Sequence, residues 1–353
     1  MAARSGQLRT RHILETGFFA TPFRRVASAT GLLALLALPH LLPPFWLGLL
    51  DLALIAVVGA VALNLLMGEA GLLSLGQGGF LAAGAFTAAA LGRELDAPVW
   101  IVLPVAAAVG VALGVAVGTP ALRLRGVYLS VSTLAAQFVV LALAHEYQSA
   151  AGGGGALVVS APQLAGAELR GDKAWYYALL AAAAVAVIIA LNLRRTHVGR
   201  AWRAIRARDL VASSLGVDVR GSKIGAFILT TTMTTVAGAL SAYYSGFVAT
   251  EAFGFPTTLQ YLAMVTVGGL GSVLGSVLGA LFITVLPYAV ERALEALPVP
   301  SAFRDLLFAV QAGAFALLML GFLLFEPRGL AGIWARLRAY AELWPFRHQP
   351  LDR

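Results

Sequence analysis

The sequence predicts an all-α polytopic membrane protein of about ten transmembrane helices, with the N- and C-termini both cytoplasmic. Two observations lead to this fold class. Hydrophobic residues make up 59% of the chain and charged residues 12%, and most of the sequence divides into apolar runs near the ~20 residues that span a bilayer. Most of the 25 basic residues lie in the tails and in alternate segments between those runs, as the positive-inside rule describes.

The expected spans form one transmembrane domain over 29–325, between a basic N-terminal tail (1–28) and a C-terminal tail (326–353). A glycine-rich loop of mixed charge, 146–173, is expected outside the cell, and a strongly basic insert, 194–223, inside it. The first and eighth spans are short. In order, the spans are 29–42, 45–67, 72–91, 99–119, 127–145, 174–193, 224–249, 257–267, 273–290 and 303–325.

Glycine patterns suggest where these helices pack closely or break. Two GxxxGxxxG rows, at 110–118 and 271–279, would let neighbouring helices approach each other. The glycine-rich stretches 71–76 and 269–275 resemble each other and precede two small-residue helices about 200 residues apart. Transporter folds often contain such repeats, with broken helices beside the substrate path. Ordinary tight helix packing is the alternative explanation for each row.

The basic insert is the most distinctive stretch of the chain. Trp202, Ile205 and Leu210 are spaced for one face of a short helix, which leaves the arginines on other faces. Asp209 is placed to cap a second short helix that Gly216 closes. Two such helices would form a docking surface for another protein, and a solvated loop is the simpler alternative. The insert holds eight basic residues: Arg194, Arg195, Arg200, Arg203, Arg206, Arg208, Arg220 and Lys223.

Several classes of function are excluded by what the sequence lacks. There is no cysteine, the five histidines have no metal-binding spacing, and neither a metal nor another cofactor is expected. The positive-inside rule accounts for the net charge of +8, so nucleic acid is not an expected partner. Neither lysine, Lys173 or Lys223, follows the glycine of a Walker loop, so the chain has no ATPase site of its own and is not expected to be an enzyme.

Ionisable groups are also sparse inside the spans, where Asp51 and Glu69 are expected to flank the second span. Proton- and sodium-coupled carriers usually place such groups at membrane depth. Their scarcity argues against a stand-alone carrier and favours a permease driven by a separate ATPase.

Five stretches then resemble the branched-chain amino-acid permeases of bacterial ABC importers, and in particular their LivM-type subunit. The resemblance covers about residues 45–332 and rests on these motifs: NLLMGEAGLLSLGQGGFLAAGAFT (64–87), LRLRGVYLSVSTLA (122–135), GRAWRAIRARDLVASSLGV (199–217), MVTVGGLGSVLGSVLGA (264–280) and FEPRGLAG (325–332). The chain departs from the family pattern at Phe86, Ala136, Gln137, Ala151, Ser213 and Ser214, and those departures bear mainly on the substrate.

The resemblance implies an ABC importer permease fold with a two-helix coupling insert, in the bacterial cytoplasmic membrane. The implied partners are two ABC ATPase subunits, a second homologous permease, a periplasmic or lipid-anchored substrate-binding protein, membrane lipid and a small-molecule substrate. Branched-chain or related amino acids are the implied substrates. Urea or short amides are the alternative substrates, and a stand-alone secondary carrier is the alternative class.

The resemblance also implies roles for individual residues. The insert would seat in the ATPase, with Arg203, Arg206 and Asp209 as polar contacts and Trp202, Ile205 and Leu215 as the apolar side. The full coupling set is Gly199, Arg200, Trp202, Arg203, Ile205, Arg206, Asp209, Leu215 and Gly216. The expected pathway and hinge set is Asn64, Gly76, Gln77, Gly79, Thr87, Ser130, Thr133, Gly268, Gly269 and Gly271.

Overall fold

The computed structural model describes residues 35–122, 124, 126–160, 163–164, 167–168, 171–295 and 329–343, and a few isolated positions between 313 and 321. Within these residues the protein is almost entirely helical, and six helices are long and apolar enough to cross a membrane. Residues 35–41 are helical, but most of the expected spans 29–42 and 303–325 lies outside the described residues. The count of ten spans therefore stays a prediction.

At each of the other eight expected spans the structure describes a helix, and six of these eight helices are long and apolar enough to cross a membrane. The helices at 72–91 and 257–267 are not among those six. In chain order, the helical elements are α3 (Pro44–Asn64), continued by a π-helical turn η1 (Leu65–Glu69), α4 (Gln77–Glu94), α5 (Val99–Ala121), α6 (Val127–Gly152), α7 (Asp172–Leu193), α8 (His197–Ala207), α9 (Asp209–Ser214), α10 (Val219–Ser245), the 3-10 turn η2 (Thr250–Phe253), α11 (Phe255–Gly268), α12 (Val273–Glu295) and α14 (Gly329–Leu343). Two antiparallel pairs of two-residue strands join β1 (Leu157–Val158) to β4 (Phe247–Val248) and β2 (Gln163–Leu164) to β3 (Ala167–Glu168).

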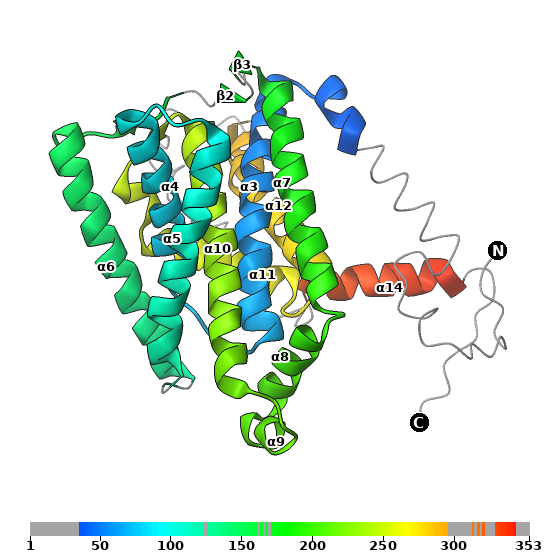
Figure 1. Cartoon of the computed structure of the whole chain (residues 1–353). Helices are drawn as coiled ribbons and strands as arrows, with labels where there is room; N and C mark the ends of the chain where they lie inside the picture. The colour runs from blue at the N-terminus through cyan, green and yellow to red at the C-terminus, as the bar shows by residue number, and fades with distance from the viewer. Residues whose placement is uncertain are drawn as a thin grey trace.

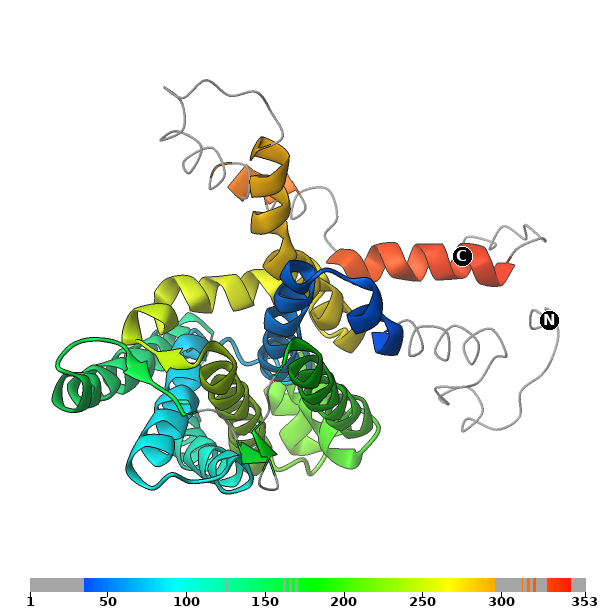
Figure 2. The ribbon, with the colours of Figure 1, turned by 90° about the horizontal axis from the view of Figure 1, so that it is seen from above.

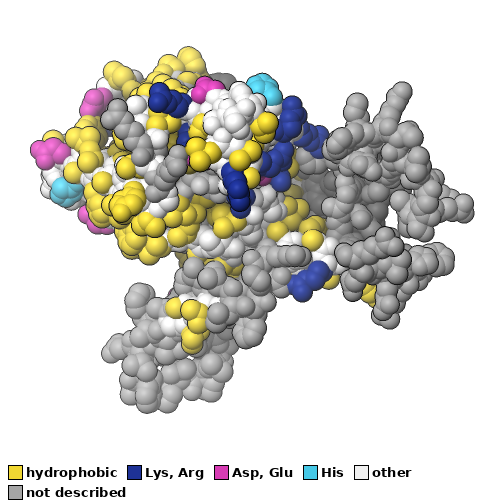
Figure 3. Space-filling view, turned by 90° about the horizontal axis from the view of Figure 1, so that it is seen from below, with side chains coloured by type: hydrophobic (Ala, Val, Ile, Leu, Met, Phe, Trp, Pro, Cys, Tyr) yellow, Lys and Arg dark blue, Asp and Glu magenta, His cyan; other side chains and the backbone are white. Residues whose placement is uncertain are grey.

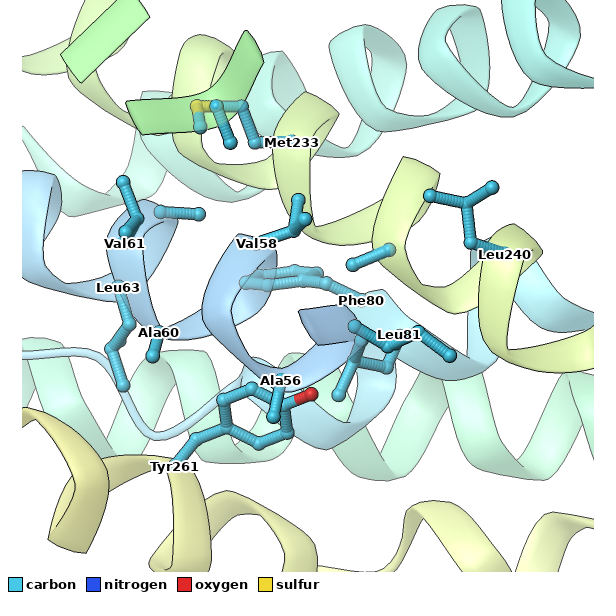
Figure 4. Close-up of a cluster of buried hydrophobic side chains, with 14 of the residues drawn as sticks. Ala56, Val58, Ala60, Val61, Leu63, Phe80, Leu81, Met233, Leu240 and Tyr261 are labelled. Carbon is cyan, nitrogen blue, oxygen red and sulfur yellow. The ribbon is translucent and has the colours of Figure 1, made fainter. Parts of the chain in front are cut away.

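Helix α3 is the centre of the bundle, with α4, α7, α10, α11 and α12 packed around it (Figures 1 and 2). Every residue from 53 to 70 is buried. Figure 4 shows how its side chains meet the neighbouring helices, with Val58 of α3 near Phe80 of α4 and Ala56 of α3 beside Tyr261 of α11. The insert helices α8 and α9 lie at one end of the bundle and the strands β2 and β3 at the other (Figure 1), which agrees with the expected alternation of loops.

The first glycine row brings α5 against α10, as its spacing predicts. A Cβ atom on Gly110 would lie 2.6 Å from the Cα of Thr232, and one on Gly114 would lie 2.5 Å from the Cα of Ile228. At such separations only a hydrogen atom fits between the two backbones. Small residues let helix backbones approach this closely, and in a membrane that packing replaces the hydrophobic driving force of water-soluble bundles.

Several helix ends differ from the expected boundaries, and glycines account for three of these differences. Helix α4 begins at Gln77 instead of 72, because residues 71–76 are non-helical and Gly71 has a φ of +71°. Helix α6 continues past residue 145 to Gly152, where Gly153 (φ +62°) ends it in the left-handed conformation. Helix α10 ends at Ser245 because Gly246 (φ +73°) caps it and β4 follows. The first difference matters most, because it places a non-helical segment inside the bundle.

We expect Gly114→Ala to destabilise the chain by about 1–3 kcal/mol, the usual cost of overpacking a tight contact. The matched control is Gly225→Ala on α10, where an added Cβ meets no atom within 4 Å and replacing a helical glycine gains about 0.5–1 kcal/mol. Thermal unfolding midpoints of both variants in one lipid system test the pair. Equal midpoints would contradict the close packing of α5 on α10.

Candidate functional site

The basic insert folds into two short helices that extend beyond the bundle (Figure 1). Thr196 begins α8, with its hydroxyl accepting a hydrogen bond from the Gly199 N–H at 3.4 Å. Trp202 and Ile205 are buried, and the Trp202 indole N–H donates to the Ser222 carbonyl at 3.0 Å. The apolar face of α8 is therefore packed on the start of α10. Figure 3, which views this end of the molecule, shows Lys and Arg side chains gathered around it.

Helix α9 presents an apolar edge to the outside. Leu210 and Leu215 are 74% and 77% exposed, and Val211 is 49% exposed. Gly216 follows with a φ of +82° and closes the helix, as the sequence predicts. The expected apolar side of the insert is thus divided. Trp202 and Ile205 pack inward, whereas Leu215 points away from the bundle together with Leu210.

Asp209 is placed differently from the expected cap. It is the first residue of α9, and the preceding residue, Arg208, occupies the cap position without a side-chain capping bond. The Asp209 carboxylate instead pairs with Lys223 Nζ at 2.6 Å, and the Lys223 side chain is 9% exposed. The Asp209 carboxylate therefore pairs with the nearly buried Lys223 ammonium group and not with the backbone of α9. The pair ties α9 to the first turns of α10.

The arginines of α8 point mostly back into the chain. Arg206 Nη1 donates to the Gly68 carbonyl in η1, and Arg203 Nη2 donates to the Arg194 carbonyl at 3.0 Å. Glu69, 3% exposed at its side chain, pairs with Arg194 Nε at 2.7 Å and lies 4.0 Å from Arg203 Nη1. These contacts connect the insert to the end of α3. Whether Arg203, Arg206 and Asp209 also contact a partner stays a prediction.

Two non-helical breaks meet where the insert touches the bundle. The first is 71–76, between η1 and α4, and the second is 269–272, between α11 and α12. Gly269 and Gly271 have φ values of +114° and +81°. Asn64 bonds to the second break twice, because its Oδ1 accepts from Gly271 N–H at 2.8 Å and its Nδ2 donates to the Ser272 carbonyl at 3.0 Å. Helix breaks at both repeat-like stretches agree with the sequence prediction.

A buried polar layer lies at the start of α4. Gln77 Nε2 donates to the Gly59 carbonyl at 3.0 Å and to Thr234 Oγ1 at 3.2 Å. Thr258 Oγ1 donates to Gln137 Oε1 at 2.6 Å and accepts from the Gly78 N–H at 2.9 Å. Gln137 Nε2, fully buried, has no hydrogen-bond partner among the described residues. Side chains of α4, α6, α10 and α11 thus meet at the N-terminal end of α4, directly after the first break.

The remaining expected site residues divide into packing glycines and hydroxyls bonded within the chain. A Cβ on Gly76 would lie 3.0 Å from the Thr133 carbonyl, and one on Gly79 would lie 2.7 Å from the Cα of Gln137. Thr133 Oγ1 accepts from the Leu75 N–H at 2.8 Å, which supports the first break. The Thr87 and Ser130 hydroxyls each donate to the carbonyl four residues earlier in the chain. The Arg200 guanidinium donates to the Arg195 carbonyl. Gly199 lies against the backbone of Leu193, and Gly268 lies against that of Gly275.

Sequence reasoning did not assign Glu69, Gln137, Thr234 or Thr258 to the site. A signal exists for Gln137, since Ser130, Thr133 and Gln137 share one helical face by their i, i+3, i+7 spacing. The run of threonines in α10 is a second signal, because it supplies hydroxyls toward both α4, through Thr234, and α5, through Thr231. The pairing of Glu69 with the insert has no local sequence signal.

Residues 45–325 match the family described as branched-chain amino acid transport system permease components. The chain belongs to this family. A permease component is a part of a transporter and not an enzyme in itself, and the apolar helices make the chain a multi-pass membrane protein.

Relatives within the family include two proteins named high-affinity branched-chain amino acid transport system permease protein LivM. That of Escherichia coli (strain K12) is 32% identical over 258 residues, which is 66% of this chain and 61% of the relative. That of Salmonella typhimurium is 32% identical over 265 residues, 67% of this chain and 62% of the relative. The matched stretch therefore spans less than two thirds of either LivM protein. LivH of Salmonella typhimurium is 31% identical over 159 residues, 45% of this chain and 46% of the relative. No solved structure matches the chain.

Asp51 differs from what the sequence led us to expect of this permease. It lies two turns inside α3, is 1% exposed, and neither carboxylate oxygen has a hydrogen-bond partner among the described residues. The nearby Tyr244 hydroxyl donates to the Gly48 carbonyl at 3.3 Å. Asp51 is near the opposite end of α3 from the insert. It is therefore a buried carboxylate remote from the helix breaks.

We expect Asp51→Asn and Glu69→Gln to shift stability in opposite directions. Asp51→Asn replaces a buried ionisable carboxyl that has no hydrogen-bond partner among the described residues, and should stabilise the chain by about 1 kcal/mol or more. Glu69→Gln removes one member of a partly exposed ion pair and should destabilise it by about 1–3 kcal/mol. Thermal unfolding of the two isosteric variants in the same detergent measures both. A loss of stability in Asp51→Asn would show that this carboxylate has a stabilising partner.

Proposed function

We propose that the chain is the transmembrane permease subunit of an ATP-binding-cassette importer that carries branched-chain or related amino acids into bacterial cells. Its relatives LivM and LivH are named for high-affinity branched-chain amino acid transport, and family membership covers residues 45–325. Their names do not favour urea or short amides as the substrate.

The observation that carries the proposal is the basic insert, with its exposed apolar edge at one end of the bundle. A solvated loop that only sets topology would not need Trp202 and Ile205 packed inward while Leu210 and Leu215 are held outward. A rigid surface of apolar groups among arginines suits a protein partner, because apolar anchors with basic neighbours are common at protein interfaces. The excess of arginine supports a cytoplasmic location for this end.

The energy comes from outside the chain, since no Walker loop is present in its 353 residues. Two ABC ATPase subunits bind the insert and close on ATP, and α8 and α9 pass that movement to α7 and α10. A second homologous permease completes the transmembrane part in the cytoplasmic membrane. A periplasmic or lipid-anchored binding protein delivers the amino acid to the opposite end.

The substrate path passes the two helix breaks. Gly76, Gln77 and Gly79 border it at the first break, and Asn64 with Gly268, Gly269 and Gly271 at the second. Thr87, Ser130 and Thr133 add hydroxyls along the same route. Polar layers built on discontinuous helices are typical of transporter binding sites, and the Gln77 and Gln137 amides with Thr234 and Thr258 make up such a layer here.

A double replacement on α9 tests the docking surface. Leu210→Ser with Leu215→Ser removes two apolar anchors, each worth about 1.5–3 kcal/mol when fully buried, so we expect the ATPase recovered with the purified permease to fall at least about tenfold. Both positions are exposed in the chain itself, so the fold of the permease should be unaffected.

Val158→Ser is the matched control, since Val158 is 75% exposed at the other end of the bundle. Unchanged ATPase recovery and unchanged uptake in the α9 double variant would reject the docking assignment. Amino-acid uptake into liposomes by the purified chain alone would instead establish a stand-alone carrier.

A further inference from the structure

The side chain of Arg206 fits into a slot made by three glycines, one from the η1 turn and one from each of the two breaks. Its guanidinium donates to the Gly68 carbonyl. A Cβ on Gly71 would lie 2.7 Å from Arg206 Cγ, and one on Gly271 would lie 3.2 Å from Arg206 Nη1. Any larger side chain at these positions would occupy the space that the arginine fills. The absence of side chains on both sides therefore makes room for this one residue.

The slot joins the two breaks to each other. Gly68 is part of the π-helical turn η1, and the first break starts at Gly71, two residues beyond the end of that turn. Asn64, one turn earlier, bonds to both Gly271 and Ser272 of the second break. π-Helical turns inside α-helices frequently mark functional sites. Because Arg206 lies against both Gly71 and Gly271, it contacts both breaks where they meet.

The insert is fastened to the bundle by two kinds of contact. Its apolar face and the pair between Asp209 and Lys223 hold it to α10, through side chains that are largely buried. The contacts to η1 are made by Arg194 and Arg203 through Glu69, and by the tip of Arg206 through Gly68. Of these residues, only Arg206 also reaches the glycines of both breaks, and it is exposed overall. Solvent competes for an exposed guanidinium, so the Arg206 contact is the one that can be broken and re-formed without unpacking the insert.

A cavity beside Arg206 gives the side chain somewhere to move. It has a volume of about 410 Å³ and lies between the first break, at Gly71 and Leu72, and the insert, at Ile205 and Leu210. The cavity is open to solvent on one side. Arg206 can therefore withdraw from the glycine slot into this space without displacing packed side chains.

We propose that Arg206 is a positioning residue that holds both helix breaks closed, and that movement of the basic insert opens them by withdrawing this side chain from its glycine slot. This deepens the proposed function, because it names the contact through which the insert acts on the substrate path. The contact itself is within the chain, so it can be tested without any partner.

The test measures how accessible the first break is to a thiol reagent. The sequence has no cysteine, so Ser74→Cys adds a single, nearly isosteric reporter at a position that is 2% exposed inside the first break. The purified full chain in lipid nanodiscs is treated with a maleimide. We expect Arg206→Ala to increase the labelling rate of this cysteine about tenfold, the change that corresponds to losing one hydrogen bond from a charged group. Arg206→Lys, which restores a donor, should label at an intermediate rate.

Two controls separate opening of the breaks from general loss of structure. Arg208→Ala removes the same charge two residues away, at a side chain with no hydrogen bond or ion pair given among the described residues, and should leave labelling unchanged. Ala183→Cys, 4% exposed in α7, should stay unlabelled in the Arg206→Ala background. If Ala183→Cys is labelled as fast as Ser74→Cys, the variant is unfolding and the proposal fails.

Labelling of Ser74→Cys that is equal in Arg206 and Arg206→Ala chains would overturn the proposal whatever the chain transports. If the labelling changes but the ATPase subunits do not bind the insert, the Arg206 contact stands and the importer assignment falls. If both hold, adding the ATPases with ATP to the parent Ser74→Cys chain should increase its labelling, and the increase should be absent when Arg206→Ala has already opened the breaks.

Discussion

A break in a helix leaves backbone N–H and C=O groups without their helical partners, and such groups are costly to bury unpaired. In this chain, side chains from other helices supply the partners. Thr133 accepts from Leu75 N–H in the first break, and Thr258 accepts from Gly78 N–H at the start of α4. Asn64 serves both the N–H of Gly271 and the carbonyl of Ser272 in the second break. Each break therefore depends on a residue distant in sequence, and this requirement determines where polar groups lie in an otherwise apolar bundle.

The rest of the bundle is more rigid than the two breaks, because its helices pack against each other at backbone distance. Gly84 and Gly238 pack α4 and α10 against each other's backbone, and Gly110 and Gly114 do the same for α5 and α10. Contacts at backbone distance leave little freedom for sliding, since packed interiors transmit displacement and do not absorb it. Movement of α10 at the insert is thus carried into the bundle as a whole, whereas the breaks, which lack helical hydrogen bonds, can change conformation locally.

How far the sequence predicts this arrangement depends on the range of each interaction. The spacing of Trp202 and Ile205 predicts that α8 is amphipathic, and Gly216 predicts the end of α9, because both are local effects. The two glycine-rich stretches predict the breaks. The partners of Arg206 and Asn64 are 138 and 207 residues away, and no local pattern identifies them. Asp209 shows the same limit, because a carboxylate placed to cap α9 is bound by a lysine that the next helix brings close. The expected start of the third span at residue 72 was wrong for a related reason. Apolar residues such as Leu72 and Leu73 occur both in helices and in extended breaks, so composition alone does not distinguish the two.

The Asn64 and Arg206 contacts at the junction differ in the free energy needed to break them. Asn64 is 3% exposed, and separating it from Gly271 would leave a buried amide and a buried backbone N–H unpaired, at about 1–3 kcal/mol for each group. Withdrawing Arg206 exposes its guanidinium to water, which solvates it, so that only the Gly68 carbonyl loses a partner. The first change that a displaced insert can produce is therefore release of Arg206, with Asn64 still bridging η1 and the second break. The breaks then stay linked to each other through Asn64, so a displacement of α8 acts on both breaks together.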